Sequence, residues 1–317
     1  MAHVVIPEFM DQTVAQDLVA RFDAHWDPDL WQKREMLLTH LADARAIIVR
    51  NATIVDAALL DAAPNLQVVA RMGVGLDNID VAACEARGVA VCPSVGANAV
   101  SVAEYVIASA MILLRGPAYY ATGDVAGGAW DRPKFAGGRE IAGLTMGIVG
   151  FGSIGQTVGQ KARALGMSVI AHDAVMPDNH AAWAAAQRVT LDTLLSEADV
   201  ISLHCPKLPQ TIDLIDGQAF ERMKPSAVLV NSARGGIVNE AACAHALRTG
   251  QIAGAALDTL DVEPIDETAQ KVFTDVPNLI LTPHIAGVTR NANRRIAEFA
   301  AETVTRILGT PTAVPAQ

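Results

Sequence analysis

Three charged or titratable side chains follow successive apolar segments in the last third of the chain. Arg234 stands just past "VLVN", Glu263 lies in the loop after "GAAL", and His284 follows "LILTP". A guanidinium can bind a carboxylate through two parallel hydrogen bonds and polarise the neighbouring carbonyl oxygen. An imidazolium can deliver a proton to that oxygen while a cofactor delivers hydride to carbon. The three residues together predict acid–base chemistry coupled to hydride transfer.

A second histidine, His204 in "SLHCP", also follows an apolar segment and competes for the acid–base role. It lies on the strand expected nearest the middle of the cofactor, and no acidic residue follows the neighbouring segment as Glu263 does. A carboxylate at Glu263 would favour the charged form of His284 and orient its ring. His284 is therefore the preferred candidate, and His204 remains the alternative.

The segment "GIVGFGSIG" places Gly150, Gly152 and Gly155 directly after an apolar run and at the start of a helical pattern. The first glycine permits a tight turn, the second lets the backbone approach a pyrophosphate, and the third lets the helix pack on the strand. Asp173 ends the next apolar run, and no Lys or Arg follows it before Arg188. Its carboxylate can accept from ribose hydroxyls but would repel a 2′-phosphate, so the motif predicts NAD as the cofactor.

Short apolar runs alternate with alanine-rich helical patterns along almost the whole chain. Continuous apolar strands separated by helices predict an α/β fold with doubly wound parallel sheets. Ligands bind such sheets at the carboxyl ends of the strands, so the three candidate residues converge if their strands are neighbours. The expected strands are 4–6, 46–50, 68–71 and 89–92, followed by 146–150, 169–173, 188–190, 200–205, 227–231, 254–257 and 279–282.

The chain is expected to contain two domains, with a boundary near residues 98–101. The segment 101–114, "SVAEYVIASAMILL", predicts a helix that is apolar on nearly every side, either interior or shared with a second subunit. The last helix, 292–308, would return to the first domain. We therefore expect a substrate-binding domain at 1–98 plus 288–317 and an NAD-binding domain at 99–287.

Composition narrows the classes of partner. The net charge of −10 argues against nucleic acid or an anionic membrane as the main partner, and the longest apolar run, 106–114, is too short to span a membrane. The four cysteines are scattered without a metal-binding pattern, and the N-terminus does not read as a signal peptide. The sequence therefore predicts a cytoplasmic protein that holds no metal.

The motifs resemble those of the NAD-dependent D-isomer-specific 2-hydroxyacid dehydrogenases, particularly the phosphoglycerate-dehydrogenase-like branch. The resemblance implies two Rossmann-like domains with the site in the cleft between them, and a homodimer built on the 101–114 helix. It runs from about residue 46 to about residue 287 and rests on "ARMGVGLDNID", "SVAEY", "GFGSIG", "LHCP", "NSARGG", "ALDTLDVEP" and "TPHIAG".

The resemblance also implies a role for individual residues. Arg234, Glu263 and His284 match the catalytic residues, and the backbone N–H groups of Val74 and Gly75 match the loop that binds the substrate carboxylate. The implied cofactor-binding residues, with Asp258 on the nicotinamide side, are Gly150, Gly152, Ser153, Ile154, Gly155, Asp173, Pro206, Thr211, Ala233 and Asp258.

Two departures from that branch leave the identity of the hydroxy acid open. "CPSVGANAV" (92–100) replaces the usual "NAPGGNT", and the sequence stops at Gln317 without the regulatory domain of long phosphoglycerate dehydrogenases. Arg50, Arg71 and Arg132 are candidates for binding a second anionic group, as in 3-phosphoglycerate, 3-sulfolactate or malate, or for structural ion pairs. The alternatives are a glyoxylate/hydroxypyruvate- or D-lactate-type reductase and a non-enzymatic, NAD-sensing corepressor-like protein.

Overall fold

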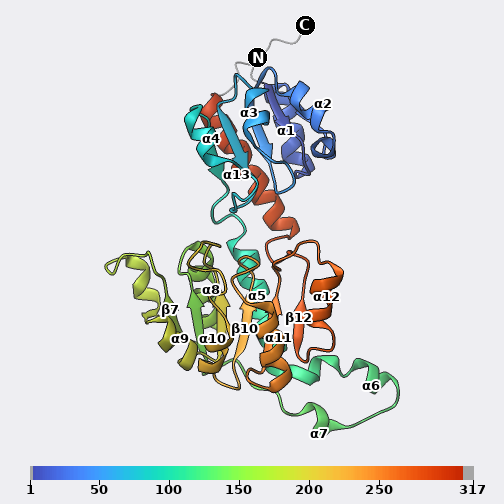
Figure 1. The fold of residues 1–317 in the computed structure, drawn as a ribbon, viewed down its shortest axis with the longest axis vertical. Coiled ribbons are helices and arrows are strands. Elements are labelled where there is room, and N and C mark those ends of the chain that lie inside the picture. The colour runs from blue at the N-terminus through green and yellow to red at the C-terminus, as the bar shows by residue number, and fades with distance from the viewer. Residues whose placement is uncertain (1–2, 310–317) are drawn as a thin grey trace. The chain divides into compact units, whose positions relative to one another are not determined.

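The computed structural model describes residues 3–309 and divides the chain into two compact units (Figure 1). The division falls between Asn98 and Ala99 and again between Gly287 and Val288. We call the part before Ala99 together with the part after Gly287 unit 1, and residues 99–287 unit 2. Each unit is built around its own parallel sheet, so the predicted pair of doubly wound α/β domains is confirmed.

Unit 1 contains five parallel strands in the order β2-β1-β3-β4-β5, which is the flavodoxin-like order of a doubly wound sheet. The sequence patterns missed β2, because it is a three-residue edge strand whose residues are all only partly buried. The strands are β1 His3–Ile6, β2 Ala24–Trp26, β3 Ala44–Val49, β4 Val68–Arg71 and β5 Ala90–Pro93.

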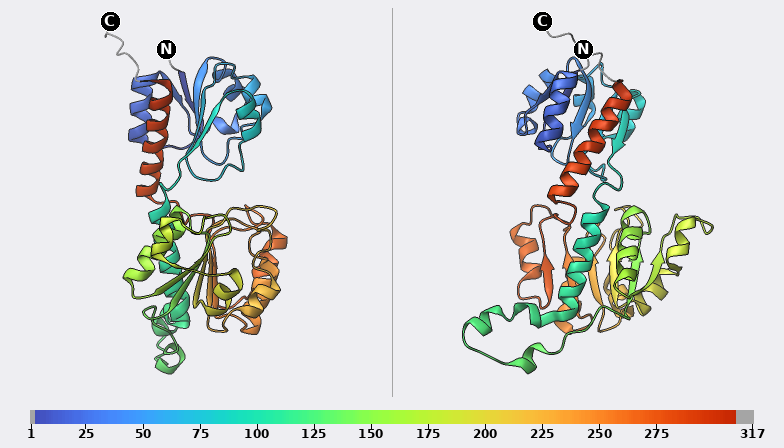
Figure 2. Two further views of the ribbon diagram at one scale, coloured as in Figure 1. Left: turned by 90° about the vertical axis from the view of Figure 1, so that its left-hand side faces the viewer. Right: turned by 180° about the vertical axis from the view of Figure 1, so that it is seen from behind.

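Helices cover both faces of this sheet. α1 and α13 lie side by side over one face, and α2, α3 and α4 cover the other (Figure 2). α13 packs here because Ala292, Ile296, Ala297 and Ala300 recur at helical spacing and are all buried. The helices are α1 Gln12–Phe22, η1 Leu30–Gln32, α2 Arg34–His40, α3 Ala57–Asp61, α4 Val81–Ala86 and α13 Arg290–Leu308.

Unit 2 contains seven parallel strands in the order β12-β11-β10-β9-β6-β7-β8. Counted from β6, this is the Rossmann order 3-2-1-4-5-6 with one further strand, and the order reverses between β6 and β9. β10, β11 and β12 are neighbours, as expected. The strands are β6 Thr145–Val149, β7 Ser168–His172, β8 Gln187–Arg188, β9 Val200–Leu203, β10 Val228–Asn231, β11 Gly254–Leu257 and β12 Leu279–Leu281.

The helices of unit 2 divide between the two faces of the sheet. α5 and α8 pack on one face, and α9 to α12 pack on the other (Figure 2, left). The helices are α5 Ala99–Arg115, η2 Gly116–Tyr120, α6 Thr122–Ala126, α7 Arg132–Phe135, α8 Ser153–Ala164, η3 Ala181–Ala185, α9 Leu191–Glu197, α10 Gly217–Arg222, α11 Glu240–Thr249 and α12 Glu267–Phe273.

α5 is the helix predicted at 101–114, but it is not buried on every side within one chain. Val100, Glu104, Ala108, Met111 and Arg115 are exposed and recur every three or four residues, so they form one stripe along the helix. Val100 is 43% and Met111 38% exposed. Apolar side chains on this stripe remain open to solvent or to a partner.

The segment after α5, which carries η2, α6 and α7, extends from unit 2 as an arm (Figure 2). Asn278 Nδ2 donates to the Leu113 carbonyl at 3.2 Å, so the carboxyl end of α5 lies where β12 begins. Arg139, just after the arm, donates to the Ser226 carbonyl ahead of β10. Arg132, in the arm, therefore lies at the end of the sheet opposite to His284.

Two classes of feature are absent from the part of the chain that the structure describes. Within residues 3–309, no helix combines the length and apolar character needed to cross a membrane. Over the same residues, no three His, Cys, Asp or Glu side chains are grouped to hold a metal ion.

A buried carboxylate ties the amino ends of two strands of unit 2. Asp199 is 7% exposed and accepts from the Thr145 N–H at 3.0 Å, from Arg139 at 2.9 Å and from Lys224 at 3.3 Å. Burial alone would raise the pKa of Asp199, but these donors outweigh it and hold the pKa below its ordinary value.

We predict that Asp199→Asn lowers the free energy of unfolding by about 2–3 kcal/mol at neutral pH, because charge-assisted hydrogen bonds are lost. The folded pKa lies below the unfolded value of about 3.9. The advantage of the wild type is therefore fully present above that value and is lost as pH falls through the folded pKa. Urea unfolding between pH 7 and pH 3 measures this.

Asp192→Asn is the matched control for this prediction. Asp192 pairs with Arg222 while 75% exposed, so its replacement should change the free energy of unfolding by less than about 1 kcal/mol. Equal stability of the wild type and Asp199→Asn at pH 7 would contradict the structural role of Asp199.

Candidate active site

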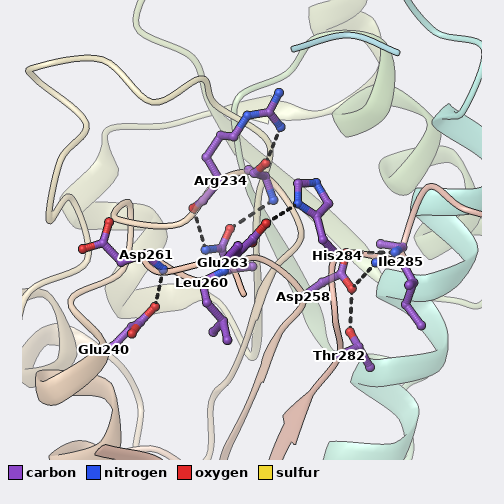
Figure 3. Close-up of polar contacts among 12 residues, drawn as sticks. Arg234, Glu240, Asp258, Leu260, Asp261, Glu263, Thr282, His284 and Ile285 are labelled. Atoms are coloured by element: carbon purple, nitrogen blue, oxygen red, sulfur yellow. Dashed lines mark hydrogen bonds and ion pairs between the residues drawn. The ribbon is translucent and has the colours of Figure 1, made fainter. Parts of the chain in front are cut away.

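Loops from the carboxyl ends of β10, β11 and β12 meet at one edge of unit 2 (Figure 3). His284 follows β12 and Glu263 follows β11, and His284 Nδ1 lies 2.8 Å from Glu263 Oε2. The imidazole is 50% and the Glu263 carboxylate 38% exposed. The pair is therefore formed in the protein and remains open to a ligand.

Glu263 fixes the orientation of the ring. Its other oxygen, Oε1, accepts from the Leu260 N–H at 2.8 Å, so both carboxylate oxygens are engaged. An ionised carboxylate only accepts, which assigns the proton of this contact to Nδ1 of His284. Nε2 is then the ring atom left for a substrate.

The backbone of His284 adopts a left-handed conformation, with φ of 55°. The buried residue Asp258 holds it there: its carbonyl accepts from the His284 N–H at 2.8 Å, and its carboxylate accepts from the Ile285 and Ala286 N–H groups, both at 2.8 Å. A β-carbon makes this conformation costly, so it persists only where contacts of this kind impose it.

Arg234 lies on the adjacent loop, after β10, where its guanidinium donates to the Ala233 carbonyl at 2.7 Å. The buried amide of Asn231 shapes this loop: Nδ2 donates to the Arg234 carbonyl at 3.0 Å, and Oδ1 accepts from the Ala233 N–H at 3.1 Å. The structure thus joins Glu263 to His284 and places Arg234 on the neighbouring strand end.

Two residues that the sequence patterns missed brace these loops. A β-carbon on Gly235 would lie 1.9 Å from the Leu260 carbonyl oxygen, so only glycine permits this approach. Glu240, at the start of α11, accepts from the Asp261 N–H at 2.7 Å (Figure 3). Burial raises the pKa of Glu240, and the nearby charges of Asp261 and Glu263 add to this. The paired glycines of "RGG" were the available signal.

The glycine-rich turn has the geometry that the motif predicts. Gly150 has φ of 89°, and a β-carbon there would lie 2.7 Å from the His204 carbonyl oxygen. A β-carbon on Gly155 would lie 2.3 Å from the Gly150 carbonyl oxygen, whereas one on Gly152 would meet open space. The turn therefore packs tightly at its first and third glycines and leaves room at the second, at the amino end of α8, where a pyrophosphate fits.

Asp173, at the end of β7, contacts this turn. Its carboxylate accepts from the Phe151 N–H at 2.8 Å and from Val175 and Met176 at 3.0 and 2.9 Å. Burial alone would raise the pKa of Asp173, but the three N–H donors outweigh it and lower the pKa. The residue therefore presents a negative charge beside the turn, which disfavours a 2′-phosphate.

The remaining cofactor candidates lie at the same end of the sheet. Ser153 and Ile154 form the first turn of α8 after β6, and Ala233 follows β10. After β9, the Thr211 hydroxyl donates to the Pro206 carbonyl at 2.7 Å and closes the intervening turn. The structure thus gathers the sequence-predicted set along one edge of unit 2.

His204 lies in a different environment from His284. Its Nε2 is 2.8 Å from the Ser202 hydroxyl, and burial lowers its pKa to about 3. A ring that stays neutral at physiological pH is a poor proton donor, and this lowered pKa favours His284 over His204 as the acid–base residue.

The substrate-binding candidates Arg50, Val74 and Gly75 belong to unit 1. The Arg71 guanidinium packs on the loop that carries Val74 and Gly75. Its Nη1 donates to the Met72 carbonyl at 2.8 Å and lies 1.6 Å from where a β-carbon on residue 73 would be. Within residues 3–309, the Val74 and Gly75 N–H groups donate to no protein acceptor. Loop and guanidinium together provide donors for an anion.

Arg50 is engaged elsewhere in unit 1. Its guanidinium donates to Asn293 at 3.3 Å and lies 5.7 Å from the centre of the Phe9 ring, and the Glu8 carboxylate accepts from its backbone N–H. Burial lowers the pKa of Arg50, against the charge of Glu8. These contacts favour a structural role for Arg50.

Known proteins resemble the chain along both units. Residues 107–286 match the family model described as D-isomer specific 2-hydroxyacid dehydrogenase, NAD binding domain. An (S)-sulfolactate dehydrogenase from Chromohalobacter salexigens is 47% identical over 310 residues, 98% of this chain and 99% of that protein. D-3-phosphoglycerate dehydrogenase from Mycobacterium leprae is 39% identical over 95% of this chain but only 56% of that protein. The structure of D-lactate dehydrogenase from Aquifex aeolicus, complexed with NAD and lactic acid, covers 99% of this chain and 100% of its own, with a TM-score of 0.79 and 25% identity.

We predict that Gly235→Ala lowers the turnover number for NADH oxidation by roughly a hundredfold, because the loops after β10 and β11 must separate, and displacements of about 1 Å at a reacting site cost this much. Stopped-flow absorbance measures the rate. Gly217→Ala is the control, since a β-carbon there meets nothing within 4 Å. Equal turnover numbers for Gly235→Ala and Gly217→Ala would contradict the bracing role of Gly235.

Proposed function

Since the chain belongs to the D-isomer-specific 2-hydroxyacid dehydrogenases, we propose that it interconverts a small D-2-hydroxy acid and its 2-oxo acid bearing a second anionic group. It is an NAD-dependent oxidoreductase, and we therefore prefer enzymatic hydride transfer to the corepressor-like alternative. Among the acids with a second anionic group, a 3-sulfolactate-like acid is our first choice, because the relative named for it is similar over nearly its full length.

The configuration of this acid is consistent with the family. In 3-sulfolactate the carbon that bears sulfur outranks the carboxyl carbon in the naming rules. The (S) label therefore describes the same spatial arrangement as D-lactate, so the name of the relative agrees with a D-specific site.

The hydrogen bond between His284 and Glu263 is the observation that carries the mechanism. We assign Arg234 to the substrate carboxylate and to polarising the C2 oxygen, and His284 Nε2 to donating a proton to that oxygen during reduction. Bound NADH supplies the hydride. In the oxidative direction His284 accepts the proton, and Glu263 keeps Nδ1 protonated and the ring in place.

The cofactor would lie along the carboxyl ends of β6, β7, β9, β10 and β11. Gly152, Ser153, Ile154 and the first turn of α8 would bind the pyrophosphate, and Asp173 would bind the ribose hydroxyls. Toward the nicotinamide, Asp258 Oδ2 accepts from the Ala286 N–H and retains acceptor capacity for a further donor. Pro206, Thr211 and Ala233 would complete the wall of this site.

We assign the second anionic group to Arg71. Its guanidinium lies against Gly73, beside the Val74–Gly75 loop that we assign to the substrate carboxylate. Arg50 is held by Asn293 and Phe9, and Arg132 lies at the opposite end of the unit 2 sheet from His284 within the chain. We choose Arg71 as the arginine that selects a charged tail because it lies beside this loop.

We also propose a homodimer through α5. The open stripe on α5 carries Val100 and Met111, and the arm that follows exposes Tyr119 at 58% and Trp130 at 78%. Apolar and aromatic side chains of this kind are enriched at subunit interfaces, and a closed two-fold pair would cover both copies. This supports the second-subunit interpretation of the helix.

A cytoplasmic location is our proposal for the compartment. All four cysteines are free: Cys84, Cys92, Cys205 and Cys243. Burial raises the pKa of Cys205 to about 11 and that of Cys243 to about 12, so both remain neutral thiols. Unpaired neutral thiols are typical of proteins in a reducing compartment.

We predict that kcat/KM for sulfopyruvate, oxaloacetate or phosphohydroxypyruvate exceeds that for pyruvate and hydroxypyruvate by roughly ten- to a hundredfold, the worth of a charge-assisted contact. Arg71→Gln should abolish this preference, whereas Arg45→Gln, at a half-buried arginine bonded to Gln67, should preserve it. Initial rates of NADH oxidation measure both. Should uncharged tails be preferred, the protein is a glyoxylate/hydroxypyruvate- or lactate-type reductase.

For the assembly, we predict a dimer at micromolar concentration in sedimentation velocity, and a shift toward monomer for Met111→Glu, because a charge on the α5 stripe would be buried without a partner. Met36→Glu, at a methionine of unit 1 that is 51% exposed, should leave the dimer intact. A wild type that sediments as a monomer refutes the interface.

A further inference from the structure

One buried carboxylate accepts two of the backbone hydrogen bonds that hold the loop 282–286, here called the His284 loop. Asp258 Oδ1 accepts from the Ile285 N–H and Oδ2 from the Ala286 N–H, and together with the bond from the His284 N–H to the Asp258 carbonyl they hold the positive φ of His284. Any movement of the Asp258 carboxylate therefore moves the imidazole. The groups that hold that carboxylate become part of the positioning of His284.

A chain of two hydroxyl groups ends on the Asp258 carboxylate. The Thr282 hydroxyl lies 2.6 Å from Asp258 Oδ1 and 2.7 Å from the Tyr105 hydroxyl. A carboxylate only accepts, so the single hydroxyl proton of Thr282 is donated to Asp258. The remaining contact then requires Tyr105 to donate to Thr282. The direction is fixed: Tyr105 to Thr282 to Asp258.

The start of this chain lies on a rigid element. Tyr105 belongs to α5, whose neighbouring residues Val102, Ala103 and Val106 are at most 3% exposed and pack into the core of unit 2. Burial raises the pKa of Tyr105, and the charge of Asp258 adds to this against the hydrogen bond with Thr282. The phenol therefore stays protonated and able to donate throughout the physiological range.

We propose that Tyr105 and Thr282 are positioning residues for the acid–base histidine, fixing His284 relative to α5 through the Asp258 carboxylate. The inference rests on the proposed role of His284. Neither hydroxyl touches the reacting atoms, and both act through hydrogen bonds in series. Because the two act in series, removing the second should make the first irrelevant.

Conservative substitutions separate this role from simple packing. Thr282→Val keeps the shape of the side chain and removes both hydrogen bonds, Thr282→Ser keeps the hydroxyl, and Tyr105→Phe keeps the ring. Thr249→Val is the control, because the Thr249 hydroxyl bonds only carbonyls within α11. Each variant is measured with the best 2-oxo acid of the wild type, for kcat, KM and NADH affinity, and by hydrogen exchange in the 282–287 peptide.

We expect Thr282→Val to lower kcat roughly ten- to a hundredfold and Tyr105→Phe roughly three- to tenfold. KM and NADH affinity should change by no more than about twofold, as for an interaction that matters in the transition state. Thr282→Ser should recover most of the loss, and the Tyr105→Phe/Thr282→Val double variant should match Thr282→Val alone. Amide exchange in 282–287 should accelerate in Thr282→Val.

Three results would overturn the proposal: an unchanged kcat in Thr282→Val, losses that multiply in the double variant, or a loss in Thr282→Ser as large as in Thr282→Val. Failure of the proposed function looks different. In that case the wild type fails to oxidise NADH whichever 2-oxo acid is supplied, or His284→Gln is as active as the wild type. An active wild type with an inactive His284→Gln and an unaffected Thr282→Val rejects the positioning role alone.

Discussion

The buried carboxylate of Asp258 determines the arrangement of the edge of unit 2 that carries the candidate site. It is 1% exposed at the end of β11, and it accepts two backbone N–H groups and one hydroxyl from the strand end next to it. A left-handed histidine costs about 1–2 kcal/mol. Each hydrogen bond to a charged group contributes about 1.5–3 kcal/mol. The hydrogen bonds of Asp258 therefore contribute more free energy than the left-handed conformation of His284 costs.

The loops around this carboxylate are braced against one another, because a parallel sheet aligns its strand ends but does not fix the loops beyond them. The Leu260 carbonyl packs on Gly235, and the Asp261 N–H is held by Glu240. Lys207, after β9, pairs with the Asp261 carboxylate at 3.0 Å. The loops after β9, β10 and β11 are thus joined, and Asp258 joins the loop after β12 to them. The backbone that carries the half-exposed imidazole is therefore braced by groups outside the site.

Much of this was readable from the sequence, because strand order and the glycine turn follow from local patterns. Apolar runs identified the strands around Gly150, Asp173 and Arg234, and the positions of Glu263 and His284 after neighbouring strands predicted their contact. The sequence patterns did not predict the edge strand β2, since it is only three residues long. The close approach at residue 235 that only glycine permits and the left-handed conformation of His284 were also not predicted. Each of these depends on contacts between segments far apart in the chain, which no local pattern encodes.

In the mechanism that we propose, His284 and not His204 exchanges the proton during hydride transfer. Single-turnover oxidation of prebound NADH by a saturating 2-oxo acid, followed at the nicotinamide absorbance, tests this most directly. We expect His284→Gln to bind NADH normally but to react about two to four orders of magnitude more slowly, the worth of a positioned acid–base group, while His204→Gln retains most of its rate. A His284→Gln variant that reacts at the wild-type rate would contradict this role.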